Sequence, residues 1–506
     1  MGKNIILCSD GTGNTTIKGR GTNVFKLFEA VDPDPSLNQK IFYDDGVGTE
    51  SFKLLKLLGG AFGLGLSNNV RQLYANLARV YEPGDNIYLF GFSRGAFTVR
   101  TLAGFIHHCG ILDPEKAKCE NDADLMNKVK GAYKAYRHRY NTVFTAVWRF
   151  LFKWRTKSKY GFTEVAEFKQ RFAHQHEHGI TPIHFIGVWD TVSAVGFPII
   201  WIKDIMNLIY QVSFPDNYLG TNVRHAYQAL SIDDKRKTFH PEMWDEGSDG
   251  EGENKRIHQV WFAGVHSNVG GGYPKQGMSL VALDWMMEYA EACDLRLIKS
   301  ARDRVHAHAN VNDKLYDSRS GLAVYYRYAP RDIDKLSKEF HIKTPLIHES
   351  VLRRSLEVTD GYAPGNLPKN GQFVATGKAG YVYPDQRNLF QQDMGPNNTL
   401  LERVANVIKL RMWMHMLFVI LSVIIAGVMI KLYSFEDLAA MLSDQTYMKL
   451  VKSVAIVLLD YPYWLLIPAA IVIALSIAAR RRIQNIFSRF WYSLKRKISA
   501  AGLKVP

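Results

Sequence analysis

The sequence has few cysteines, no hydrophobic leader and no recognisable nucleic-acid-binding motif. Its 506 residues include four cysteines, and none forms a C-x-x-C pair, which is typical of a reducing compartment. The first apolar run, residues 5–8, is far too short for a signal peptide. No dense set of cysteine, histidine and carboxylate side chains indicates a metal site. We therefore expect a fold that depends on a hydrophobic core rather than on disulfides or metal ions.

Charge of one sign dominates the chain. Its 63 Lys and Arg residues outnumber 48 Asp and Glu residues, which gives a net charge of +15. Such an excess suits nucleic acid or an anionic membrane surface. Because no nucleic-acid motif is recognisable, the membrane is the favoured partner. With 47% hydrophobic residues, the chain is predicted to form one large domain with an appendage.

Two stretches near the C-terminus, residues 412–430 and 462–479, carry no formal charge. As helices they would each reach roughly 27–29 Å, close to the hydrocarbon thickness of a bilayer. We therefore predict a large domain over residues 1–395 and a membrane anchor with two transmembrane helices over residues 396–506. Lys and Arg residues are concentrated after the second stretch, so the positive-inside rule places both termini and the large domain in the cytoplasm.

The chemistry is expected to centre on Gly91–Gly95, which reads Gly-Phe-Ser-Arg-Gly. An apolar strand over residues 87–90 precedes it, and residues 96–106 have a helical pattern. Gly-x-Ser-x-Gly between a strand and a helix is typical of the nucleophile elbow of serine hydrolases. The turn lifts the hydroxyl above the sheet, next to the N-terminus of the following helix. Ser93 is therefore the predicted nucleophile.

A glycine-containing loop follows the first predicted strand, residues 4–8. Its backbone N–H groups at Gly11, Thr12 and Gly13 are of the kind that bind a developing oxyanion, together with the N–H of Arg94. A purely structural turn is the alternative. The loop is not a Walker motif, because no Gly-Lys-Ser/Thr follows it.

A serine nucleophile needs a base and a carboxylate that orients the base. Two predicted strands, residues 183–190 and 258–265, are the source of both: Asp190 ends the first and His266 follows the second. The chain order Ser–Asp–His is that of α/β hydrolases. On the residues alone other candidates remain, namely Asp233 and Asp234 for the acid, and His107, His108, His225 and His240 for the base. His107 and His108 are poor candidates, because they lie at the far end of the helix that follows Ser93.

Three further segments have distinctive compositions. Residues 114–178 are helical and basic, and within them residues 148–159 interleave aromatic and basic side chains, as expected at a membrane interface or on a helix that covers the sheet. Residues 196–214 are apolar and are predicted to form a lid, an acyl-chain-binding wall or ordinary core. Residues 296–395 are turn-rich and contain no motif that chemistry alone explains.

Several runs together resemble a bacterial α/β-hydrolase family that includes the type VI secretion phospholipase effectors. The resemblance extends over about residues 1–376. It is carried by these runs: CSDGTGNT (8–15), YDDGVGTE (43–50), YEPGDNIYLFGFSRGAFTVRTLAGFI (81–106), FIGVWDTV (185–192), HAYQALSIDD (225–234), WFAGVHSNVGGGY (261–273), DSRSGLAVYYRYAPRDI (317–333) and IHESVL (347–352).

The resemblance implies Ser93 as nucleophile, Asp190 as acid and His266 as base, in an α/β fold with a central, mostly parallel sheet and helical insertions. It also implies phospholipase or related ester hydrolase activity for some members. Asn268 stands where many members have Asp, which leaves the three catalytic positions intact. The two-span tail is a larger departure, because secreted lipase effectors do not generally require one.

We therefore expect a membrane-anchored serine hydrolase at the bacterial inner membrane, acting on carboxylic esters and chiefly on phospholipids. The expected chemistry calls for no metal or organic cofactor, and the sequence does not address calcium. An esterase for soluble acyl esters that is tethered to the membrane is one alternative. A membrane-active toxin or interaction protein that uses the hydrolase fold as a scaffold is another. The sequence identifies no immunity or secretion-system partner.

Overall fold

A computed structural model describes residues 2–11, 21–45, 61–138, 164–176, 180–193, 217–250, 252–381, 383–394, 399–432 and 466–503. Within these ranges the core is a nine-stranded sheet in the order β2-β1-β3-β4-β5-β6-β7-β8-β9. The strands are β1 Asn4–Ser9, β2 Gln39–Asp44, β3 Asn86–Phe92, β4 Ile183–Trp189, β5 Val223–Ser231, β6 Ile257–Phe262, β7 Leu346–His348, β8 Gln372–Ala375 and β9 Lys378–Tyr381.

The first eight strands are parallel, and β9 returns antiparallel to β8. The predicted α/β class with a mostly parallel sheet is confirmed. The direction of winding reverses at β1, which pairs with β2 on one side and β3 on the other. Ligands of open α/β sheets bind beyond the carboxyl ends of the strands at such a point. Ser93 and the loop that begins at Asp10 follow β3 and β1, so both start at this position.

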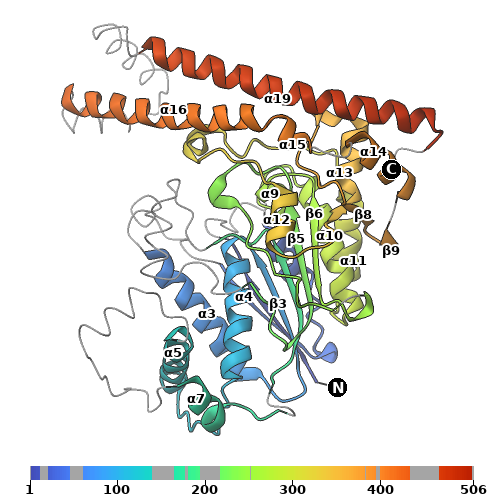
Figure 1. Cartoon of the computed structure of the whole chain (residues 1–506). Helices are drawn as coiled ribbons and strands as arrows, with labels where there is room; N and C mark the ends of the chain where they lie inside the picture. The colour runs from blue at the N-terminus through green and yellow to red at the C-terminus, as the bar shows by residue number, and fades with distance from the viewer. Residues whose placement is uncertain are drawn as a thin grey trace.

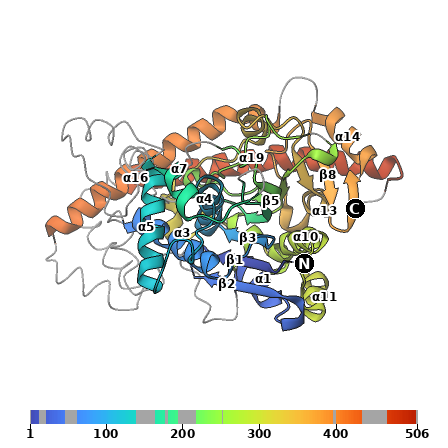
Figure 2. The same cartoon turned by 90° about the horizontal axis from the view of Figure 1, so that it is seen from below.

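Helices cover both faces of the sheet, as Figures 1 and 2 show. Alternate strand residues point to opposite faces: Ile5 and Leu7 belong to the hydrophobic cluster that includes side chains of α3, α4, α5 and α7, whereas Ile6 and Cys8 belong to the cluster that includes α1, α10 and α11. The first group comprises α3 Ala61–Val80, α4 Arg94–Cys109, α5 Asp122–His138 and α7 Val165–Phe172. The second comprises α1 Asn23–Ala30, α10 Gly277–Ala292 and α11 Lys299–His308.

The C-terminal third adds three short strands that the sequence patterns did not reveal. Strands β7, β8 and β9 have only three or four residues each, too few for a clear alternation of apolar and polar side chains. The short helix α9 His266–Gly270 follows β6. The remaining helices are α12 Ile333–Glu339, α13 Glu349–Glu357, α14 Pro384–Met394, α15 Leu400–Arg403, α16 Ala405–Leu432 and α19 Leu466–Ala500.

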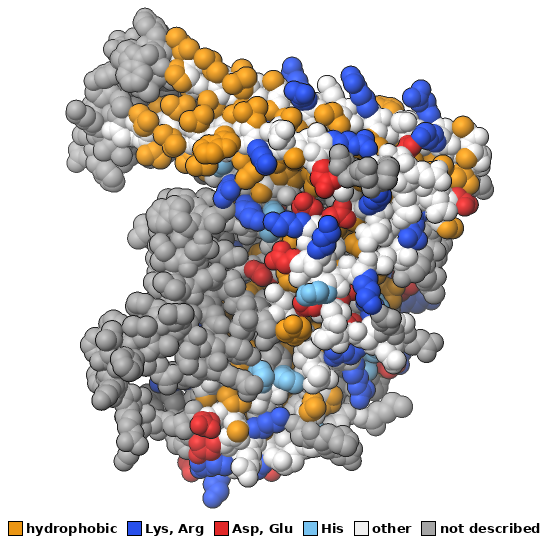
Figure 3. All heavy atoms as spheres, viewed as in Figure 1, with side chains coloured by type: hydrophobic (Ala, Val, Ile, Leu, Met, Phe, Trp, Pro, Cys, Tyr) orange, Lys and Arg blue, Asp and Glu red, His pale blue; other side chains and the backbone are white. Residues whose placement is uncertain are grey.

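Helices α16 and α19 lie side by side across the top of the molecule in Figure 1. The part of α16 over residues 405–425 is long and apolar enough to cross a membrane. Within the described ranges it is the one helical segment that meets both conditions. The second predicted span lies partly outside those ranges, so the two-span anchor stays a prediction. Apolar side chains of both helices gather at the left end of the pair in Figure 3, and Trp413, Val423 and Ile467 are each about 60% exposed or more.

The second half of α19 packs against the large domain through its apolar side chains. Phe487, Trp491, Leu494 and Ile498 belong to one hydrophobic cluster with side chains of β8, α13 and α14. The indole Nε1 of Trp491 donates to the carbonyl of Pro364 at 2.8 Å. The basic stretch after the second predicted span therefore contributes apolar side chains to a core that it shares with the large domain. The domain boundary at residue 395 stays a prediction.

Candidate active site

The residues of Gly91–Gly95 form a tight strand-to-helix turn. Ser93 has φ 57° and ψ −120°, a left-handed conformation that is costly for a residue with a side chain. A Cβ on Gly91 would lie 2.6 Å from the carbonyl oxygen of Gly95, and a Cβ on Gly95 would lie 2.0 Å from that of Ser9. Both positions therefore require glycine. Ser93 is held beside β4 by its N–H, which donates to the carbonyl of Trp189 at 3.0 Å.

The register of the sheet brings the three predicted catalytic residues together. Phe92 pairs with Trp189, so the residues after them, Ser93 and Asp190, leave the sheet side by side. The Nε2 atom of His266 lies 2.8 Å from the Ser93 hydroxyl, and its Nδ1 atom lies 2.6 Å from Asp190 Oδ2. The imidazole contacts the rings of Phe92 and Phe239. This is the geometry of a nucleophile, a base and an orienting carboxylate.

Burial decides the charge of the imidazole. His266 is almost fully buried, and this lowers its pKa below the usual value, although the hydrogen bond and charge of Asp190 act in the opposite direction. The ring is therefore neutral at neutral pH and able to accept a proton.

Asp190 is fully buried and keeps its charge. Burial alone would raise its pKa, but the ion pair with Arg331, followed by the hydrogen bond with His266, holds that pKa well below the usual range. The N–H and hydroxyl of Ser231 also donate to its two oxygens, at 2.9 and 3.1 Å. The residue has φ 39°, a second strained position at this edge of the sheet.

The alternative acids have other tasks in the structure. Asp233 accepts hydrogen bonds from the N–H of Gly264 and the hydroxyl of Tyr362, and burial raises its pKa. Asp234 pairs with Arg236 at 2.6 Å and accepts a 3.3 Å hydrogen bond from the backbone N–H of His266. Asp234 thus binds the backbone of His266, whereas Asp190 binds its ring.

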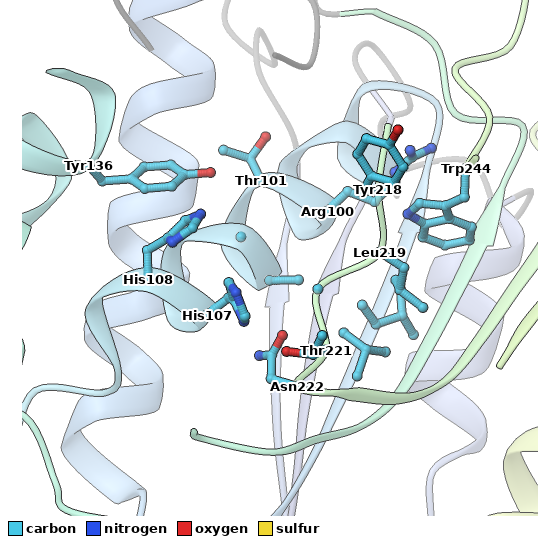
Figure 4. A pocket seen from close by; sticks show the side chains of 15 residues that line it. Arg100, Thr101, His107, His108, Tyr136, Tyr218, Leu219, Thr221, Asn222 and Trp244 are labelled. Carbon is cyan, nitrogen blue, oxygen red and sulfur yellow. The ribbon is translucent and has the colours of Figure 1, made fainter. Parts of the chain in front are cut away.

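The alternative bases lie in different surroundings. His107 and His108 line a cavity of about 250 Å³ near the end of α4 remote from Ser93, together with Tyr136 and Asn222 (Figure 4). The rings of His225 and His184 are in contact. His240 hydrogen-bonds the carbonyl of Ala329 through Nε2. Of the predicted histidines, His266 is the one whose ring reaches the Ser93 hydroxyl.

The predicted oxyanion site lies only partly in the described ranges. Arg94 is the first residue of α4, in the turn whose N–H groups have no carbonyl acceptor within the helix. The N–H of Gly11 donates to the Asp10 carboxylate at 2.6 Å. Thr12 and Gly13 lie outside the described residues, as do the lid segment 196–214 and the basic aromatic segment 148–159. These assignments stay predictions.

Arg331 and Ser231 both bind Asp190, and the motif analysis identified neither of them. Arg331 comes 141 residues after Asp190 in the chain. It stands in the run 317–333 that was noted as part of the family resemblance, but the surrounding residues have neither helical nor strand periodicity. The only signal was therefore that run itself.

Residues 3–289 match the family model described as "T6SS, Phospholipase effector Tle1-like, catalytic domain". This range is more than half of the 506 residues. The chain belongs to the Tle1-like phospholipase effector family. The family's catalytic domain contains Ser93, Asp190 and His266, whereas Arg331, α16 and α19 lie beyond the matched range. The resemblance to this family is thereby confirmed, and six of the eight sequence runs lie within the matched range, whereas the runs 317–333 and 347–352 lie beyond it.

Two proteins with some similarity to this Tle1-like chain are described as uncharacterised. Protein YEL023C of Saccharomyces cerevisiae is 32% identical over 256 residues, which are 47% of this chain and 32% of the yeast protein. The chain thus spans about a third of that protein's length. A crystal structure from Pseudomonas aeruginosa has 17% identity and a TM-score of 0.34, covering 78% of this chain and 58% of the other. Neither description names a reaction.

Proposed function

We propose that this Tle1-like protein is a membrane-tethered serine hydrolase that cleaves carboxylic ester bonds of phospholipids. The observation that carries the proposal is the continuous hydrogen-bonded path from the Ser93 hydroxyl through His266 to the buried Asp190. The family, described as phospholipase effectors, supports a lipid ester as the substrate.

In the proposed reaction, the Ser93 hydroxyl attacks the ester carbonyl while His266 Nε2 accepts its proton. The Asp190 carboxylate keeps the imidazole in the tautomer that has a proton on Nδ1 and stabilises the imidazolium that forms. The N–H of Arg94, with an N–H of the loop that includes Gly11 and Thr12, would bind the oxyanion; for Gly11 this requires its N–H to leave the Asp10 carboxylate. His266 then protonates the leaving alcohol, and water releases the acyl group from Ser93 with the same base. These steps use only groups of the chain and water.

We further propose that the apolar halves of α16 and α19 enter the bilayer, with the catalytic domain and both termini in the cytoplasm. Their exposed apolar side chains would be costly in water, and membrane insertion removes them from it. Because α19 also packs into the domain core, a bilayer around the first half of this helix would hold the active site near the lipid surface.

The test is hydrolysis by the purified full-length protein of mixed phospholipid vesicles, with release of fatty acid as the readout and Ser93→Ala as the matched control. We expect release by the native chain alone. Equal release by the native chain and by Ser93→Ala would overturn the proposal. So would a native chain that hydrolyses neither vesicles nor short soluble esters. Cleavage of soluble esters without any attack on vesicles would favour the tethered esterase.

A further inference from the structure

Arg331 is a fully buried arginine that binds both oxygens of Asp190, the proposed catalytic acid. Its Nη1 and Nη2 atoms donate to Asp190 Oδ1 and Oδ2 at 2.6 and 2.8 Å. Two parallel bonds of this kind fix a carboxylate in both position and plane. The same two nitrogens also donate to the carbonyls of Ser231 and Phe239, so the guanidinium is itself held in place.

The carboxylate of Asp190 is saturated with donors. Oδ1 accepts from Arg331 and the N–H of Ser231, while Oδ2 accepts from Arg331, the Ser231 hydroxyl and His266 Nδ1. Arg331 and Asp190 neutralise each other before any proton moves. A carboxylate already paired with a guanidinium attracts a proton on His266 less strongly than a lone carboxylate would.

Two other charged groups act on His266 in the described part of the chain. Asp234 and Arg236 follow β5 and form an ion pair with each other, so their effects on the imidazole oppose one another. Ser93, which precedes α4, is neutral. Within the described ranges, the rings of Phe92 and Phe239 also contact the imidazole. Arg331 acts on this charge balance through Asp190, the carboxylate that binds the imidazole.

Resting on the proposed function, we propose that Arg331 is a positioning residue: it fixes the Asp190 carboxylate beneath His266 and limits how strongly that carboxylate holds a proton on the imidazole. Its backbone is secured independently of the side chain. The N–H of Ala329 donates to the carbonyl of Lys235, and the side chain of Asn366 donates to the carbonyl of Arg331. Arg236 and Tyr328 also form a β-bridge. Substitution of the side chain therefore tests the guanidinium rather than the path of the chain.

The experiment measures how fast an alkyl fluorophosphonate labels Ser93 in the full-length protein as a function of pH, with the adduct located by mass spectrometry. In this step Ser93 Oγ forms a bond to phosphorus, fluoride leaves and His266 takes the proton, so the rate reports the base without any lipid substrate. For Arg331→Met, we expect the acid limb of the rate profile to move up by about one pH unit, since the uncompensated Asp190 retains a proton on His266.

Arg331→Lys keeps the charge but cannot bind both oxygens, so we expect a midpoint near the native value and a plateau rate about tenfold lower. This variant decides the matter if loss of a buried ion-pair partner prevents Arg331→Met from folding. Arg354 supplies the matched control, because it is equally buried but donates to the carbonyls of Val311 and Asp313. Arg354→Met and Arg354→Lys should alter the melting temperature and leave the rate profile unchanged.

Native midpoint and plateau in folded Arg331 variants would overturn the positioning role and leave Arg331 as a structural ion pair. A shifted profile that the Arg354 variants share would overturn it as well. Failure of the proposed function is distinguishable, since it would show as a native chain whose Ser93 reacts with the phosphonate but which hydrolyses neither vesicles nor soluble esters.

Discussion

At the ends of β4 and β6 the protein buries charged and titratable side chains, whereas along α16 and the first half of α19 it exposes apolar ones. Asp190 and Arg331 are fully buried, and His266 is nearly so; Trp413 and Val423 are each 66% exposed. Both arrangements are costly in water. The first is stabilised by hydrogen bonds within the chain, whereas the second leaves apolar side chains exposed in the described part of the chain, which the proposed membrane insertion would cover.

The second half of α19 adds a third case. There the helix buries apolar residues in the hydrophobic core, although many of the residues between them are basic. We thus attribute the buried charges of the proposed active site to catalysis, and the exposed apolar side chains of α16 and the first half of α19 to the proposed membrane contact. The second half of α19, which packs on the large domain and is called its docked half below, needs neither explanation. Each prediction below tests one side of this comparison.

The largest effect is expected at the nucleophile and base. Ser93→Ala or His266→Ala should lower kcat for ester hydrolysis by about a millionfold, because the residues of such a triad act as a unit. The double variant should be no worse than either single one. Steady-state rates on a soluble ester, together with unchanged melting of Ser93→Ala, provide the measurement. Near-native rates in Ser93→Ala would contradict the hydrolase mechanism.

Asp190→Asn should lower kcat by about ten-thousand-fold, because an amide no longer stabilises the correct tautomer and charge of His266. It also leaves Arg331 buried without its counter-ion, so we expect a lower melting temperature. Asp233→Asn is the matched control, since it changes a buried carboxylate that binds Gly264 and Tyr362 instead. A severe loss in the control with a mild loss in Asp190→Asn would mean that the acid is misassigned.

Trp491→Ala should lower the free energy of unfolding by about 3–5 kcal/mol, since it removes a buried indole from the cluster shared with α14. Tyr492→Ala, the adjacent and 55% exposed aromatic residue, should change stability by about 0.5 kcal/mol or less. Denaturant unfolding of the two variants in the same detergent compares them directly. Equal effects would show that the docked half of α19 is not part of the core.

Ile420→Asp should weaken membrane association without affecting the fold, because Ile420 is about half exposed on α16. An aspartate at the centre of a membrane helix costs about 3 kcal/mol relative to isoleucine. Vesicle flotation and melting temperature measure the two quantities. Tyr218→Asp, at an exposed aromatic residue of the large domain, is the control. Insertion of α16 would be contradicted if both variants lost flotation to the same extent, or if neither variant lost it.

The sequence by itself determined the local features. Gly91 and Gly95 reveal the turn at Ser93, because only glycine tolerates the close backbone contacts that such a turn creates. Asp190 and His266 could be chosen because parallel strands end at a common edge of the sheet, so that residues far apart in the chain meet there. The uncharged run in α16 stands out for a similar reason, since length and composition alone meet the requirement for crossing a bilayer.

Only the tertiary structure decided which partners these features acquired. Arg331 contacts Asp190 across 141 residues, and no local periodicity records a single side chain that reaches in from a loop. Likewise, Trp491 and Leu494 stand among basic residues that are typical of a solvated tail, and it is the apolar surface of β8 and α14 that makes them core. Periodic patterns report which face of an element is apolar, whereas packing between distant segments decides what that face meets.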